Sequence, residues 1–323
     1  MEVLKAEGIR KSFRGDLSLA RREVLHGVTL EAWGEEILGF LGPNGSGKTT
    51  TIKIILGLIR PDSGDVTIFG RPVGDRSAMA RIGYLPEKPF FYPHLSLTEF
   101  LRFCGQMSGM GGKSLSSRIH EVAEAVGLGT NGDVRLKNFS KGMLQRAGLA
   151  QAILHDPDLL ILDEPFSGLD PLGRIMVRDL LIDLRKRKKT IFFSSHILPD
   201  VETLCDRTCI IREGLIVRYI GLDELLRIGK GKVEVTARGC RLDGTEALWD
   251  YVESSNEVGE EICLVVKEQE LVRPVVQYLY NLGAEILKVA NKHPSLEEIF
   301  MDEVTKGTGD HRHAKREKEI TLA

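Results

Sequence analysis

A glycine-rich stretch that ends in Lys48 and Thr49 carries the clearest chemistry in this 323-residue sequence. Its residues match the phosphate-binding loop pattern GxxxxGK[ST], and they are Gly42, Pro43, Asn44, Gly45, Ser46, Gly47, Lys48 and Thr49. Glycines let successive backbone N–H groups turn toward a phosphate, and the helix that follows adds partial positive charge. We expect Lys48 to bridge the β- and γ-phosphates of a nucleotide and the Thr49 hydroxyl to bind Mg²⁺. Thr50 is included in this expected nucleotide site.

Two adjacent acids, Asp163 and Glu164, follow the apolar run Leu159–Leu162. A short apolar run is typical of a buried strand in a parallel sheet, and ligands bind at the carboxyl edge of such sheets. Asp163 suits Mg²⁺, directly or through water, and Glu164 is placed to polarise an attacking water. The structural alternative for both acids is a solvated turn.

A second candidate anion site contains Ser140 and Gly142, near the beginning of an expected helix. The serine and the first free N–H groups of the helix could bind an anion, but a serine at this position is also an ordinary N-cap. Two phosphate sites in one chain make sense if the second serves a nucleotide held by another copy.

Apolar periodicity predicts the elements that position these residues. Short strands are expected at Val3–Ala6, Val24–Leu30, Ile37–Leu41, Leu159–Leu162 and Thr190–Ser194. Helices are expected at Gly47–Leu58, Ser96–Met107, Ser114–Val126, Lys141–His155 and Gly173–Arg187. The glycine loop thus follows a strand and opens a helix, and the last strands flank a helix as in a βαβ unit. A parallel sheet is the fold that this order favours.

Composition excludes several classes of protein. The sequence is 42% hydrophobic and 28% charged, and 44 Lys plus Arg against 46 Asp plus Glu give a net charge of −2. This balance is typical of a globular protein and argues against a surface built to bind nucleic acid. No apolar run approaches the roughly 20 residues of a membrane helix, and the N-terminus lacks a secretory signal pattern. We therefore expect a cytoplasmic protein.

Five features occur in a fixed order along the chain: the loop with Lys48, the Ser140 segment, the strand that ends in Asp163 and Glu164, the segment Ser167–Asp170, and His196. As a set, over about residues 1–220, they resemble the nucleotide-binding subunit of an ABC transporter. The resemblance implies a P-loop α/β cassette with a parallel core sheet, an N-terminal antiparallel β subdomain and a helical subdomain at about residues 90–155. It also implies ATP and Mg²⁺, and a head-to-tail dimer in which Ser140 and Gly142 of one copy close over ATP held by the other.

The resemblance carries further roles onto single residues. Phe13 resembles the aromatic residue that stacks on adenine, although a core phenylalanine is the alternative from sequence alone. His196 lies where the family's switch histidine contacts the γ-phosphate, and Asp170 matches the acid that signals across the dimer. Glu164 resembles the general base for in-line attack of water on the γ-phosphate.

Two positions depart from the common pattern of the family. Glu87 stands where a glutamine usually contacts Mg²⁺; a carboxylate is a good Mg²⁺ ligand but adds negative charge near the γ-phosphate. The signature is Phe139-Ser140-Lys141-Gly142-Met143 instead of Leu-Ser-Gly-Gly-Gln. Both variants are familiar in the branch that resembles ATP-binding subunits of ABC-2 type exporters.

The sequence after Gly221 predicts a small α/β domain at residues 222–304. Strands are expected at Lys232–Ala237, Ile262–Lys267 and Ile286–Ala290, with helices near Thr245–Glu253, Glu270–Leu282 and Ser295–Val304. Residues 305–323 have mixed charge and little apolar content, so we expect a disordered tail.

The aromatic cluster Pro89–Pro93 is expected to dock a membrane partner, with core packing as the alternative. We thus expect an ATPase subunit that forms a homodimer on binding ATP and powers export through a separate integral membrane permease, at the inner face of the cell membrane and without nucleic acid. One alternative is a soluble ABC-type ATPase that acts on nucleic acid or the ribosome; the near-neutral charge and the single cassette disfavour it. Another is a slow nucleotide switch with a regulatory C-terminal domain. The transported substrate is not specified.

Overall fold

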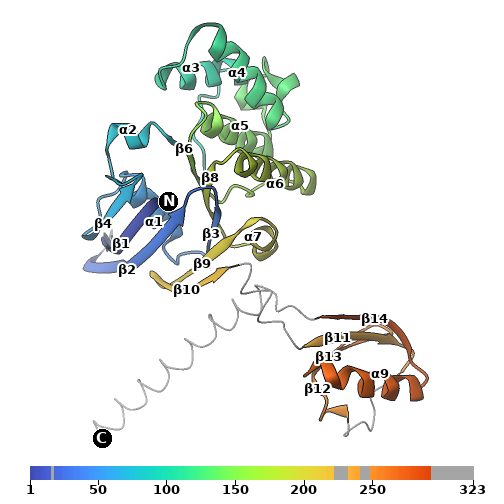
Figure 1. The fold of residues 1–323 in the computed structure, drawn as a ribbon. Helices are drawn as coiled ribbons and strands as arrows, with labels where there is room; N and C mark the ends of the chain where they lie inside the picture. Colours follow the sequence, from blue (N-terminus) through green and yellow to red (C-terminus); the bar gives the residue numbers. More distant parts are fainter. Residues whose placement is uncertain (16–17, 222–231, 241–247, 292–323) are drawn as a thin grey trace, which may run out of the picture. The chain divides into compact units, whose positions relative to one another are not determined.

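The chain divides into two compact units, Met1–Ile220 and Gly221–Ala323 (Figure 1). The computed structural model describes residues 1–15, 18–221, 232–240 and 248–291. Each unit has its own sheets and its own hydrophobic core. The phosphate-binding loop and all other candidate catalytic residues belong to the first unit.

A four-stranded antiparallel sheet begins the first unit, in the order β2-β1-β4-β5. Its strands are β1 (Glu2–Gly15), β2 (Ser18–Trp33), β4 (Ser63–Ile68) and β5 (Arg71–Pro72). The first two are much longer than the apolar runs predicted, because they pair with each other from Glu2 opposite Trp33 to Phe13 opposite Arg22 and beyond. Cross-strand pairing thus extends both strands past their apolar segments.

A six-stranded sheet forms the centre of this unit, in the order β10-β9-β3-β8-β7-β6. Its strands are β3 (Ile37–Leu41), β6 (Ile82–Leu85), β7 (Leu159–Asp163), β8 (Thr190–Ser195), β9 (Arg207–Arg212) and β10 (Leu215–Gly221). The pairs β3–β8, β3–β9, β6–β7 and β7–β8 are parallel. Every residue of β3, β7 and β8 is buried, as expected for central strands of a parallel sheet.

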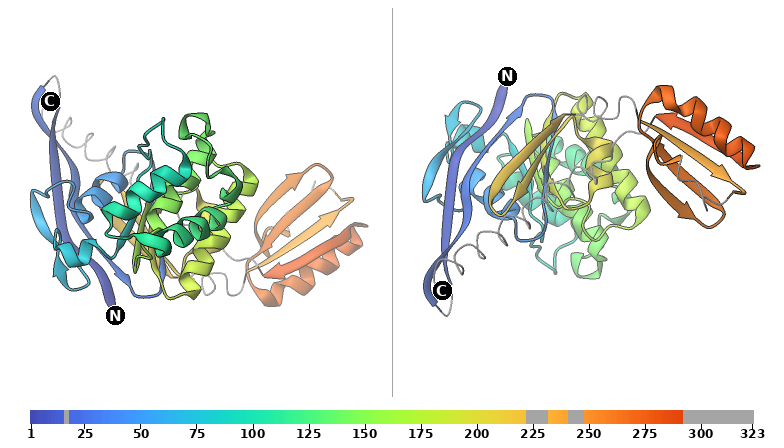
Figure 2. Two further views of the ribbon diagram at one scale, coloured as in Figure 1. Left: turned by 90° about the horizontal axis from the view of Figure 1, so that it is seen from above. Right: turned by 90° about the horizontal axis from the view of Figure 1, so that it is seen from below.

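Five helices of the first unit agree closely with the sequence periodicity, whereas two short helices, Arg76–Met79 and Leu198–Leu204, were not predicted. The helices of this unit are α1 (Lys48–Ile55), α2 (Arg76–Met79), α3 (Leu97–Met107), α4 (Gly112–Ala125), α5 (Lys141–Ile153), α6 (Pro171–Lys186) and α7 (Leu198–Leu204), with 3₁₀ turns at Gly129–Asn131 and Leu136–Asn138. A capping box between Ser96 and Glu99 fixes the beginning of α3. Figure 2 shows the blue hairpin of β1 and β2 along one side of this unit and the green helices beside it.

The core of the first unit joins its two sheets around α1. Leu4 and Leu30 of the antiparallel sheet, Ile52 of α1, and Phe40 and Phe192 of the parallel sheet belong to one buried cluster. The two phenylalanine rings lie 5.4 Å apart, centroid to centroid. Helix α1, which follows the glycine loop, is therefore held between the sheets by its apolar face.

The second unit contains a four-stranded antiparallel sheet in the order β12-β13-β11-β14. Its elements are β11 (Val233–Arg238), β12 (Val252–Val258), β13 (Glu261–Val266), a 3₁₀ turn (Gln269–Leu271), α9 (Val272–Asn281) and β14 (Glu285–Asn291). The helix predicted near Thr245–Glu253 is wrong at its end, because Leu248 is in a 3₁₀ turn but β12 begins at Val252. The Val252 side chain is buried and its backbone pairs with Val266, so tertiary pairing overrides the local pattern. The helix predicted at Ser295–Val304 and the tail at 305–323 lie outside the described residues.

Candidate active site

The carboxyl ends of β3, β7 and β8 bring the candidate residues together. Leu41 of β3 lies opposite Ser195 of β8, and Asp163 of β7 lies opposite Ser194. The glycine loop, Glu164 and His196 come directly after these three strands, so parallel pairing places segments that are far apart in sequence at one edge of the sheet.

Two glycines of the loop are required by their surroundings. Gly47, the N-cap of α1, has φ of 110°, and a Cβ there would lie 2.6 Å from the Leu25 side chain. A Cβ on Gly42 would lie 2.5 Å from the carbonyl oxygen of Ile211. The backbone therefore approaches its neighbours too closely for any side chain at either position.

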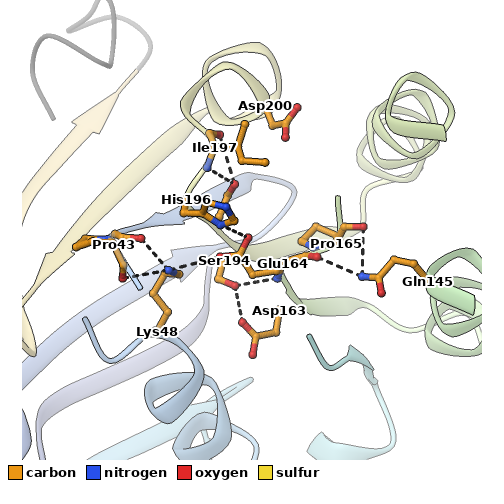
Figure 3. A network of polar contacts seen from close by, with 12 residues as sticks. Pro43, Lys48, Gln145, Asp163, Glu164, Pro165, Ser194, His196, Ile197 and Asp200 are labelled. Atoms are coloured by element: carbon orange, nitrogen blue, oxygen red, sulfur yellow. Dashed lines mark hydrogen bonds and ion pairs between the residues drawn. The ribbon is translucent and has the colours of Figure 1, made fainter. Parts of the chain in front are cut away.

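Lys48 is buried at the start of α1 and points into the turn of the loop (Figure 3). Its Nζ donates hydrogen bonds to the carbonyl oxygens of Gly42, at 2.7 Å, and Pro43, at 3.3 Å. The same ammonium lies 3.5 Å from Oε1 of Glu164. A buried ammonium needs anionic partners, and a triphosphate would supply stronger ones than two backbone carbonyls.

Glu164 links this lysine to His196. Its other carboxylate oxygen, Oε2, lies 2.9 Å from Nδ1 of His196, whose side chain is about half exposed (Figure 3). An ionised carboxylate only accepts hydrogen bonds, so this contact requires a proton on Nδ1. Glu164 has φ of 52°, an uncommon backbone conformation for a side chain other than glycine, and the turn that holds it aims the carboxylate at both partners.

Asp163 is fully buried beneath this turn. Ser194 Oγ donates a hydrogen bond to Oδ1, while Oδ2 has no hydrogen-bond partner among the described residues. Burial raises the pKa of the Asp163 carboxyl, and the hydroxyls of Ser194 and nearby Thr49 oppose that rise. Ser46 Oγ, in the glycine loop, is likewise buried without a partner.

These two orphaned oxygens fit the ligands expected at the site. Buried polar atoms are normally paired, and Mg²⁺ prefers carboxylate and hydroxyl oxygens while keeping several waters. Asp163 and Thr49 could therefore hold Mg²⁺ together with a nucleotide, and Ser46 could donate to a phosphate. No group of three or more His, Cys, Asp and Glu side chains among the described residues could hold a metal by itself.

A cavity of about 500 Å³ opens above the loop. Its lining comprises Arg22, Val24, Asn44, Gly45, Gly47, Lys48, Thr49, Thr50, Glu87, Glu164, Ser167 and His196. Ten of these twelve residues were singled out from the sequence. The other two, Arg22 and Val24, were missed because the residues around them match no motif.

Eight residues expected at the nucleotide do not line this cavity. Gly42, Pro43 and Ser46 belong to the glycine loop itself and Asp163 is fully buried. The other four are Phe13, Ser140, Gly142 and Asp170. Ser140 Oγ instead accepts a hydrogen bond from the Met143 N–H as the N-cap of α5. Asp170 caps α6 through the Gly173 N–H, and a Cβ on Gly142 would lie 3.1 Å from the Gly168 carbonyl. The beginnings of α5 and α6 thus pack together outside this cavity.

Gln145 is a structural residue of the site that the sequence did not reveal. It is buried in α5, and its Nε2 donates to the backbone carbonyls of Glu164, at 3.2 Å, and Pro165, at 3.4 Å (Figure 3). A polar residue among the apolar positions of α5 was the available signal. The helical subdomain is thereby tied to the turn that carries Glu164.

The fold and the site define a P-loop nucleotide-binding cassette. The family model described as "ABC transporter" matches residues 25–167. An uncharacterized ABC transporter ATP-binding protein of Synechocystis sp. is 40% identical over 93% of this chain and 84% of its own length. The Nod factor export ATP-binding protein I of Rhizobium sp. is 32% identical over 91% of this chain and 94% of its own. A solved ATP-binding subunit of an ABC transporter, 30% identical, superimposes with a TM-score of 0.63 over 70% of this chain and 92% of its own.

The chain belongs to the family of ABC transporter ATP-binding proteins. The expected cassette fold, with its parallel sheet, antiparallel β subdomain and helical subdomain, is confirmed. None of the helices among the described residues is long and apolar enough to cross a membrane.

Proposed function

We propose that this chain hydrolyses ATP with Glu164 as the general base. The chain of contacts from Lys48 through Glu164 to His196, at the mouth of the glycine loop, carries the proposal. Lys48 would exchange its carbonyl partners and Glu164 for the β- and γ-phosphates, which frees the carboxylate to orient a water and accept its proton. A His196 ring that contacts Glu164 through Nδ1 and a phosphate oxygen through Nε2 would be protonated on both nitrogens.

Mg²⁺, when bound, would neutralise charge that develops on the phosphates. Asp163 and Thr49 would hold it, and Glu87, which is exposed on the cavity wall, would be a further oxygen ligand, an acid where the family usually has a glutamine. The unpaired Oδ2 of Asp163 supports this assignment.

A Glu164→Gln variant tests hydrolysis directly. The amide retains the shape of the side chain but cannot accept the proton, so we expect turnover to fall roughly 10²- to 10⁴-fold while ATP binding persists. Asp179→Asn, which removes an exposed carboxylate from α6, is the matched control and should hydrolyse ATP like the wild type. Normal turnover by Glu164→Gln would overturn the proposal.

We also propose a head-to-tail homodimer formed on binding ATP, in which Ser140 and Gly142 of one copy face the nucleotide of the other. Its support is that Ser140 caps α5 outside the cavity of its own chain. Ser140→Asp preserves a good N-cap but sets a negative charge against phosphate, whereas Ser140→Asn preserves the cap without charge. In the Glu164→Gln background, light scattering with ATP should show a monomer for Ser140→Asp and a dimer for Ser140→Asn.

The membrane partner would dock on an aromatic surface formed by Phe90, Tyr92 and Phe103. These side chains are 82%, 42% and 44% exposed, and Tyr92 packs edge-on against both phenylalanines. Exposed aromatic clusters are typical of interfaces. Phe91 is excluded from this surface, since it is buried against Phe100.

Export is the proposed direction of transport, because a relative that covers nearly the whole chain is named as an export ATP-binding protein. The chain would then act at the inner face of the cell membrane, beside a separate permease. Residues 222–304 would be an accessory domain, as their own core around Val235, Leu264 and Leu279 suggests. Co-purification of a multispanning protein with the wild type would support a separate membrane partner. Its loss in a Phe90→Ala and Tyr92→Ala double variant would support docking on the aromatic surface.

A further inference from the structure

The cavity extends beyond the phosphate-binding loop to the hairpin of β1 and β2. Arg22, Val24 and Gly45 line both this cavity and a smaller hollow of about 150 Å³, so the two spaces adjoin. By the proposed function, Lys48 and Thr49 hold the terminal phosphates. The space beside the hairpin is therefore what remains for the nucleoside.

Arg22 stands on the same face of this hairpin as Phe13. The two are direct partners in the antiparallel ladder, and residues directly opposite each other in such a ladder project to the same side. Only Arg22 lines the cavity, whereas Phe13 is 39% exposed beside it. The Lys11 ammonium, which donates a hydrogen bond to Asp62, lies 5.6 Å from the centroid of the Phe13 ring. A cation therefore already lies close to this ring.

The Arg22 guanidinium is available for a ligand. Among the described residues no hydrogen bond or ion pair engages its side chain. The neighbouring acid, Glu23, is already paired with Arg10, at 3.0 Å, and His26, at 3.3 Å. A planar cation without a partner at the nucleoside end is well suited to stack on a purine, because guanidinium groups are weakly hydrated and lie flat on aromatic faces.

We infer that Arg22 binds the nucleobase of ATP by stacking its guanidinium on the purine ring. This inference rests on the proposed nucleotide site and names a residue that recognises the nucleoside within it. Phe13 would then border the base instead of providing its only stacking surface. Lysine cannot replace arginine fully, because a point charge lacks the planar face.

Nucleotide binding to the full-length chain tests this assignment. The variants are Arg22→Ala, Arg22→Lys and the matched control Arg21→Ala, whose side chain projects to the opposite face of β2. The ligands are ATP, ADP and inorganic tripolyphosphate, measured by calorimetry. We expect Arg22→Ala to weaken ATP and ADP equally, about five- to tenfold, and to leave tripolyphosphate unchanged. Arg22→Lys should recover only part of the loss, and Arg21→Ala should match the wild type.

The outcomes separate the possible failures. Unchanged ATP affinity in Arg22→Ala, or an equal loss for Arg21→Ala, would overturn the inference while the proposed function stands. A parallel loss of tripolyphosphate affinity would also overturn it, because the contact would then be to phosphate. If wild-type protein bound tripolyphosphate and ATP equally weakly, the proposed function itself would fail.

Discussion

Ser194 Oγ donates a 2.6 Å hydrogen bond to Oδ1 of Asp163, across the parallel pair β7–β8. The same hydroxyl oxygen accepts the Glu164 N–H at 3.0 Å. One serine therefore positions both the proposed metal ligand and the backbone of the proposed base. Parallel pairing makes this possible, because the serine comes from the neighbouring strand at the same level.

Ser194→Ala is expected to destabilise the site and the fold together. It leaves a buried carboxylate oxygen and a buried N–H without partners, at a cost of roughly 1–3 kcal/mol in the free energy of unfolding. Urea unfolding without nucleotide measures this cost. Ser194→Thr retains the hydroxyl and should restore most of the stability, whereas an alanine variant as stable as the wild type would contradict the expectation.

Gln145→Leu is expected to slow hydrolysis more than it weakens binding. The change removes the donor for the Glu164 and Pro165 carbonyls, so the turn that aims the carboxylate loses its support from α5. We expect kcat to fall several-fold, with ATP affinity within about twofold of the wild type. Gln106→Leu, at an exposed position of α3, is the control. Equal losses of binding and turnover would instead indicate general unfolding of the site.

His155 is expected to make stability depend on pH. Burial lowers its pKa below the ordinary value of 6.5, and its Nε2 lies 3.0 Å from the Ile82 carbonyl. The unfolded chain therefore binds the proton more readily, so the stability from neutral His155 is complete above pH 6.5 and is lost as the pH falls through the lowered value. His155→Gln should flatten this loss in unfolding titrations at pH 8 and pH 5.5. The exposed His120→Gln should leave the slope unchanged.

Neighbouring phenylalanines are expected to respond in opposite ways to truncation. Phe91→Ala removes a buried ring that packs against Phe100, which costs about 3–5 kcal/mol of stability. Phe90→Ala removes an exposed ring and should change stability by less than about 0.5 kcal/mol. Thermal unfolding distinguishes the two. If Phe90 is part of the docking surface, only its variant should lose the membrane partner while remaining folded.

The positions of the site residues could be predicted from the sequence where the local pattern and the fold agree. The glycine loop could be placed because Lys48 begins a helix directly after a fully apolar strand, and Asp163 because it ends another. Gln145 and Ser194 act through backbone groups and side chains that are 19 and 31 residues away, so no local pattern marks them. Arg22 lies at the cavity only because a long hairpin carries it there.

The wrong helix prediction at Val252 has a similar cause. Residues around Val252 have no strong preference of their own, and pairing with β13 decides their conformation. The aromatic residues Phe90, Phe91 and Tyr92 are likewise consecutive in sequence, but Phe91 is buried while the other two are exposed. Successive side chains cannot all face the same way. Which of these rings is buried depends on tertiary packing, which cannot be inferred from the local sequence.

The position of Gln145 in α5 has one more consequence. Ser140 begins this helix and Gln145 lies five residues later, about 7.5 Å along the axis. In the proposed dimer, the nucleotide of one copy would meet Ser140, while Gln145 holds the Glu164 turn of the other site. One rigid helical segment of less than two turns would thus contact both ATP sites. Binding of ATP at one site would then affect the other, so the two sites would be cooperative.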